Sequence, residues 1–335
     1  MSEEIKLNEV DDFFDLHYFA LNKKFQIFCG LWPLETGYMK YFKQGAMGAI
    51  ILANLILFSH ALGTFCGTNM DYCCENMLGV VYCITGFSKL VGISTTGGKF
   101  TGIYKMIARN WRETTDEIEY SILEKYARIS KMLTRLYIVA FLMTGGVVTQ
   151  APAIPLLLNY IIPLNESRQA IPIVNTDYSI TPYTRFAHLW VHYSFTAVAV
   201  ACVFIAIDAT FVLIVFQILA TLDVVKQRIR QASSVESENA EQSYGILVKA
   251  VKLHKDAIEF LNLSNEANSL QFLVVLGGTI FNISFGSLAI LSRAGAYADF
   301  ARIGILTLGY LFQLFVLCLL GELIISSSSE LFVIP

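Results

Sequence analysis

Charge is scarce in this chain. Asp, Glu, Lys and Arg together make up 15% of its 335 residues, whereas a soluble domain usually carries about 25%. Hydrophobic residues make up 55%, and the mean hydropathy is +0.56. This balance is typical of a polytopic membrane protein. The net charge of −3 leaves no basic excess, so nucleic acid is not an expected partner.

Catalytic and metal-binding motifs are also missing. The sequence holds no HExxH, GxSxG or P-loop pattern, and its five histidines are dispersed. His188 and His192 share one face of a helix, but no third metal ligand accompanies them. We therefore expect no enzymatic activity, no cofactor and no metal site. The two histidines are interpreted as part of a polar, aromatic helix entrance at the outer membrane interface.

Long apolar runs dominate what is present. Crossing a bilayer as a helix takes roughly 20 residues, and six segments are suitable: about 45–65, 77–93, 136–158, 186–222, 270–291 and 303–325. The fold class we expect is an all-α polytopic membrane protein with six transmembrane helices. Amphipathic stretches at about 114–132 and 240–268 predict long cytoplasmic extensions of these helices. Thr114 and Glu117 fit a capping box that would begin the first stretch.

Lys and Arg alternate along the connections. The N-terminal arm, residues 1–44, and the connections after the second and fourth segments are rich in them, whereas the other connections hold at most two. The positive-inside rule then places the arm in the cytoplasm and fixes the sense of every later crossing. Asn165 begins an Asn-Glu-Ser triplet in the longest predicted outer connection, where glycosylation is expected.

Three charges, Lys89, Asp208 and Glu322, fall within predicted spans, where charge is costly and often functional. Glu322 lies at the inner end of the sixth span and is expected to be solvated. Lys89 lies toward the cytoplasmic half of the second span, and we expect its side chain to extend to the interface. Asp208 lies far along the fourth helix, near the cytoplasmic boundary, and is expected to be solvated. No series of carboxylates crosses the membrane, which argues against a pump or coupled transporter.

A ligand site is the remaining candidate function. Small-molecule pockets are mostly apolar and carry a few polar groups. The predicted outer halves of spans two, three, four and six supply Tyr82, Val147, Gln150, His192, Tyr193, Phe195, Thr196, Ile305 and Tyr310. The alternative is that these are ordinary packing residues. Cys66, Cys73 and Cys74 flank the first outer turn, where one pair could form a disulfide or all three could stay reduced.

Four short motifs together resemble the insect odorant receptor family. Leu21-Asn22-Lys23-Lys24 precedes Gly30-Leu31-Trp32-Pro33, which is similar to the family's short helix and Gly-hydrophobic-Trp-Pro turn. Residues 224–229 are similar to the end of its fourth helix, and residues 253–260 to its cytoplasmic helix before span five. Gly321-Glu322-Leu323-Ile324, with Ser329-Glu330-Leu331, is similar to the start of its seventh-helix region. Their order, with the predicted topology, extends the resemblance over nearly the whole chain.

The resemblance implies a multi-pass receptor subunit in the plasma membrane of olfactory sensory neurons. It implies that small hydrophobic odorants bind among spans two, three, four and six. It also implies a hetero-oligomer with an olfactory co-receptor subunit, a tetramer that forms a ligand-gated, non-selective cation channel. The family's seventh helix lines the pore, and residues 326–335 match only the start of that region. We therefore expect this chain to bind odorant but not to conduct alone.

Three other protein classes are alternatives. A gustatory-type receptor of the same superfamily is an alternative, which the cytoplasmic helix and the Leu-Trp-Pro opening make less favoured. A G-protein-coupled receptor would place its N-terminus outside and carry an Asp/Glu-Arg-Tyr triplet after the third span, and neither property is predicted here. A membrane transporter is the least favoured.

Overall fold

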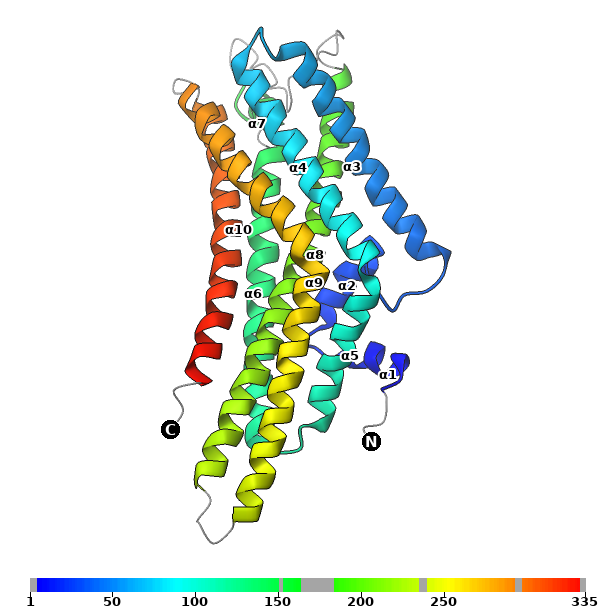
Figure 1. Cartoon of the computed structure of the whole chain (residues 1–335). Helices are drawn as coiled ribbons and strands as arrows, with labels where there is room; N and C mark the ends of the chain where they lie inside the picture. The colour runs from blue at the N-terminus through cyan, green and yellow to red at the C-terminus, as the bar shows by residue number, and fades with distance from the viewer. Residues whose placement is uncertain (1–4, 151–152, 164–183, 235–239, 293–296, 332–335) are drawn as a thin grey trace.

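The structure, a computed structural model, describes residues 5–150, 153–163, 184–234, 240–292 and 297–331, and its regular elements there are all α-helices. In chain order they are α1 (Leu7–Phe13), α2 (Ala20–Cys29), α3 (Tyr38–Phe65), α4 (Met70–Thr95), α5 (Gly97–Glu113), α6 (Glu117–Gln150), α7 (Ile154–Ile161), α8 (Thr184–Ser234), α9 (Ala240–Ser292) and α10 (Tyr297–Glu330). Figure 1 shows them as an elongated bundle, with both termini toward its lower end. This is the all-α architecture that the composition predicts.

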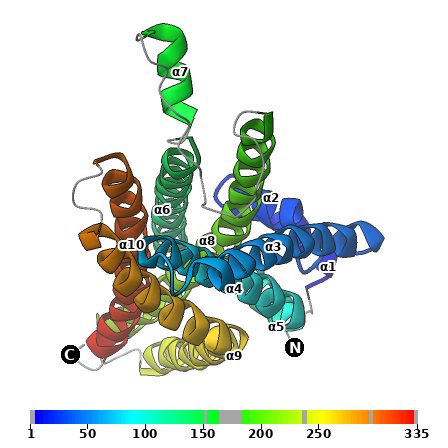
Figure 2. The ribbon, with the colours of Figure 1, turned by 90° about the horizontal axis from the view of Figure 1, so that it is seen from above.

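Six of these helices, α3, α4, α6, α8, α9 and α10, are long and apolar enough to cross a membrane. The amphipathic stretches at about 114–132 and 240–268 are continuous with the spans, because α6 and α9 each run unbroken through both. The third segment differs from the expected 136–158. There α6 ends at Gln150, and a separate helix α7 follows with Pro155 in its first turn, where proline is tolerated. Figure 2 shows α7 projecting from the bundle.

Helix α8 forms the centre of the bundle. In its most apolar window 83% of the residues are buried, compared with 17–39% in the other five helices. A helix that is hydrophobic on all sides is stable only when it is surrounded. Figures 1 and 2 show α4, α6, α9 and α10 around it. The other five helices leave apolar faces exposed, as lipid-facing helices do.

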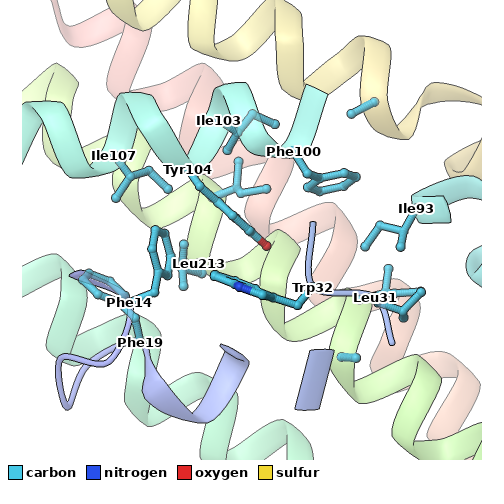
Figure 3. Close-up of a cluster of buried hydrophobic side chains, with 14 of the residues drawn as sticks. Phe14, Phe19, Leu31, Trp32, Ile93, Phe100, Ile103, Tyr104, Ile107 and Leu213 are labelled. Atoms are coloured by element: carbon cyan, nitrogen blue, oxygen red, sulfur yellow. The ribbon is translucent and has the colours of Figure 1, made fainter. Parts of the chain in front are cut away.

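The N-terminal arm folds back onto the lower half of the bundle (Figure 1). Trp32 stacks on Tyr104 of α5 with ring centroids 5.0 Å apart (Figure 3), and its indole nitrogen donates to Asp11 at 2.7 Å. The amide of Gln26 donates to the Tyr104 hydroxyl at 2.6 Å and to the Thr210 hydroxyl of α8. Burial raises the pKa of Tyr104 above its usual range, so the phenol stays protonated. The arm is thereby fixed to both α5 and α8.

Glycine is required where the arm turns. Gly30 ends α2 with φ +71°, in the left-handed region that other residues avoid. A Cβ atom at this position would lie 2.5 Å from the Lys40 carbonyl oxygen. The glycine of the Gly-Leu-Trp-Pro motif therefore permits the turn after α2 that places Trp32 against Tyr104.

The start of α6 differs from the predicted capping box. Asp116, not Thr114, caps the helix, because its Oδ1 atom accepts the backbone N–H groups of Ile118 at 2.8 Å and Glu119 at 3.0 Å. The Thr114 hydroxyl instead donates to the Asn110 carbonyl at the end of α5. Asp caps a helix at least as well as Thr, so residue type alone does not favour Thr114 over Asp116.

A disulfide joins α3 to α4 at the upper end. It links Cys66 to Cys73, whose Cα atoms lie 4.9 Å apart, while Cys74 is buried in α4 and does not belong to this bridge. Between them Asn69 caps α4 by accepting the N–H groups of Asp71 and Tyr72. The predicted glycosylation residue Asn165 lies outside the described residues.

Ion pairs connect the lower ends of α6, α8 and α10. The Lys226 ammonium lies 2.7 Å from Glu330 and 3.1 Å from Asp223, and it donates to Ser327 at 3.0 Å. Arg228 forms a bidentate pair with Glu119, at 2.6 and 2.7 Å. The last turn of α10 is thus held against α8.

Candidate ligand-binding cavity

A cavity of about 220 Å³ lies in the upper half of the bundle, between α3, α4, α6, α8 and α10. Its walls are mostly apolar and aromatic, and include Phe58, Leu78, Tyr82, Phe141, Val200, Ile303, Leu306 and Tyr310. The arrangement is typical of small-molecule pockets, which form between the helices of bundles.

Small residues give the cavity its shape. A Cβ atom at Gly79 would lie 2.6 Å from the Phe58 ring, so the glycine lets that ring lie directly against α4. At Gly145 of α6, which also lines the cavity, a Cβ atom would meet no other atom within 4 Å. A larger side chain at Gly145 would therefore find room at the cavity wall without displacing a neighbour.

An ion pair belongs to the wall of the cavity toward its upper end. Arg302 of α10 pairs with Glu75 of α4, and their side chains are 8% and 12% exposed. Both residues line the cavity. Charges that are this buried are tolerated only when they are paired. This pair also connects α4 to α10 at the cavity wall.

A second ion pair lies below the cavity, and the lining residue Gln313 is hydrogen-bonded to it. The Gln313 amide nitrogen donates to Asp208 at 3.2 Å, and Asp208 in turn pairs with Lys89 and accepts the Tyr137 hydroxyl. The Lys89 ammonium also lies 4.8 Å from the centroid of the Phe204 ring. The network joins α4, α6, α8 and α10 at the middle of the bundle.

These contacts correct two sequence-based expectations. Lys89 is only 1% exposed and does not extend to an interface, and Asp208 is buried, not solvated. Each charge is stabilised by the other and by hydrogen bonds. The sequence could not show this, because the partners are 119 residues apart.

Four of the nine candidate ligand residues line the cavity: Tyr82, Tyr193, Thr196 and Tyr310. The other five, Val147, Gln150, His192, Phe195 and Ile305, do not, and all but the half-buried Ile305 are exposed. Helical phase explains the difference. On α6 the lining residues recur at spacings of three and four: Ala140, Phe141, Thr144, Gly145, Val148 and Thr149. Val147 and Gln150 lie beside that face.

Several lining residues were missed. Asn54 and Phe58 come from α3, a span that the sequence did not assign to the pocket. The Asn54 amide donates to the Thr196 hydroxyl at 2.9 Å, which links α3 to α8 across the wall. Glu75, Arg302 and Gln313 were also missed. A polar residue within an otherwise apolar span, such as Asn54 or Gln313, was the available signal.

Comparison with known proteins gives a consistent result. Residues 69–332 match the sequence model of the family described as 7tm Odorant receptor. The olfactory receptor OR5 of the insect Machilis hrabei, solved in complex with eugenol, has a similar structure: the TM-score is 0.68 at 10% identity, covering 92% of this chain and 80% of that one. A second structure of the same OR5 receptor gives a TM-score of 0.66 at 11% identity, covering 94% of this chain and 82% of that one. By sequence, no curated protein matches the chain.

Proposed function

Because this chain belongs to the 7tm odorant receptor family, we propose that the cavity between α3, α4, α6, α8 and α10 binds small hydrophobic odorants. The observation that supports this most directly is the largely apolar cavity wall with a few polar groups. At about 220 Å³ the cavity is smaller than the roughly 300–1,000 Å³ of drug-sized pockets. Its ligand is therefore small, as volatile compounds are. The eugenol complex of OR5 shows that a protein of this fold takes a small aromatic ligand.

Filling the cavity tests this assignment. Replacing Gly145 by Leu places an apolar side chain at the wall in open space, and leucine has the better helix propensity. We expect the fold to be retained and binding of small aromatic odorants to fall at least tenfold, measured by calorimetry on the purified chain. Gly245→Leu is the matched control, because Gly245 also has open space around it but lies in α9 and not at the cavity. Equal binding by both variants and the unchanged chain would contradict the assignment.

We further propose that the chain acts as a subunit of a hetero-oligomeric, non-selective cation channel with an olfactory co-receptor, in the plasma membrane of olfactory neurons. The chain is a multi-pass membrane protein by its family and its six apolar helices. Ligand binding would favour one of two packings of α10 against α8, since both helices reach the cavity. The test is the odorant-evoked cation current of cells that express this chain with and without the co-receptor. Equal current from the chain alone would contradict the need for a partner.

We propose that the lower end of the bundle faces the cytoplasm. Its support is the positive-inside rule, since the arm, α5 and the junction of α8 with α9 carry most of the Lys and Arg. The test is a tag placed before α1: antibody should reach it only after the cells are permeabilised. Staining of intact cells would reverse the orientation.

A further inference from the structure

Gln313 places a hydrogen-bonding group at the base of the cavity. It is 4% exposed and lines the cavity wall on α10. Its amide nitrogen donates to Asp208 at 3.2 Å. Its carbonyl oxygen, Oε1, has no hydrogen-bond partner within the described part of the chain.

The chemistry of Asp208 fixes which way this amide points. An ionised carboxylate can only accept hydrogen bonds, so the nitrogen of Gln313, not the oxygen, must face it. Lys89 pairs with one oxygen of the Asp208 carboxylate, and the Tyr137 hydroxyl donates to the other oxygen, which Gln313 also contacts. The Gln313 carbonyl oxygen is therefore turned away from Asp208 and offers an acceptor.

An acceptor that a bound ligand shields from water without offering a donor costs about 1–3 kcal/mol in general. An apolar ligand would leave this acceptor unsatisfied and would also keep water from it. A ligand with an O–H group would satisfy it. A site that is built to hydrogen-bond a hydroxyl group discriminates against analogues that lack it far better than an apolar wall discriminates by size.

We propose that the cavity selects small apolar ligands that carry a hydroxyl group, a phenol or an alcohol, and that Gln313 is the residue that accepts the hydroxyl proton. The proposal rests on the odorant-binding role of the cavity. Asp208 acts as a positioning residue, because it holds the Gln313 amide in the required orientation. The hydroxyls of Tyr82 and Tyr310, which also line the cavity, can donate to the ligand oxygen.

A pair of matched probes isolates the hydrogen-bond donor. Eugenol is a phenol, and its O-methyl ether keeps the ring and the ether-type acceptor but cannot donate. We expect the purified full chain, in detergent or nanodiscs, to bind eugenol about tenfold more tightly than the ether by calorimetry, a factor equivalent to about 1.4 kcal/mol. The unchanged chain thus tests the proposal without any variant.

Variants assign the preference to one side chain. Gln313→Leu should bind both probes with similar affinity, because the acceptor is gone. Gln150→Leu is the same chemical change at an exposed position of α6 outside the cavity, and it should keep the full preference. Asp208→Asn should reduce the preference, because an Asn amide can itself donate to the Gln313 oxygen.

The possible results distinguish failure of the role proposed for Gln313 from failure of odorant binding at the cavity. Equal binding of both probes to the unchanged chain, or a preference that survives Gln313→Leu, overturns the role of Gln313 and leaves odorant binding intact. Failure of the unchanged chain to bind either probe overturns the cavity as an aromatic odorant site, and this proposal with it.

Discussion

The buried ion pair between Lys89 and Asp208 contributes strongly to the stability of the chain. Removing one partner of such a pair leaves an uncompensated charge, which costs about 3–5 kcal/mol. We expect Asp208→Leu to lower the stability of the chain by that order, measured by thermal unfolding in detergent. The network also joins four helices, so its loss should affect the whole bundle.

The double variant separates charge from packing. Replacing Lys89 by Met together with Asp208 by Leu removes both charges and fills the space with apolar atoms. Such replacements are often neutral or stabilising, so we expect the double variant to recover most of the lost stability. A double variant as unstable as Asp208→Leu alone would show that Tyr137 and Gln313, not Lys89, are the partners that matter.

Gly30 is a second residue whose identity the structure requires, because there is no room for a Cβ atom. Alanine there meets the Lys40 carbonyl oxygen and must also adopt a left-handed conformation, which costs about 1–2 kcal/mol before the clash is counted. We expect Gly30→Ala to loosen the arm, with faster hydrogen exchange in α1 and α2. Gly45→Ala is the control, since Gly45 is helical and has open space around it; it should exchange as the unchanged chain does. Equal protection in the two variants would contradict this account.

Elements were easier to predict than contacts. Runs of apolar residues are long and local, so the all-α class and the six long helices followed from the sequence. Residue-level pairing was not local: Lys89 and Asp208 looked like two isolated charges near an interface. The cap of α6 shows the same limit on a smaller scale, because Thr114 and Asp116 are both good caps.

The candidate site was predicted only in part, for a geometric reason. Apolar spans give little indication of which face of a helix turns inward, since every face is hydrophobic. A choice by residue type therefore found the tyrosines but also took His192 and Phe195, which lie beside the lining residues Tyr193 and Thr196. Only four of the nine candidates line the cavity, because the helices were predicted but the face that each turns toward the cavity was not.

At the scale of the molecule, the last turn of α10 depends on Lys226 of α8. That ammonium is 5% exposed and reaches Glu330, Ser327 and Asp223. We expect Lys226→Met to free the end of α10, with faster hydrogen exchange over residues 323–331. Lys249→Met is the matched control, because Lys249 is exposed on α9 and its side chain forms no ion pair among the described residues. Unchanged exchange in Lys226→Met would show that apolar packing alone holds this end.

The length of α8 has a mechanical consequence. This helix of 51 residues borders the cavity at Thr196, meets the ion network at Asp208 and ends beside α9. From Asp208 to Ser234 its axis runs about 39 Å at 1.5 Å per residue. Pivoting at Asp208, a tilt of about 3° would displace the far end by about 2 Å by simple leverage over that length. A helix held at this point converts a displacement of less than about 1 Å at the cavity wall into one of about 2 Å at its far end.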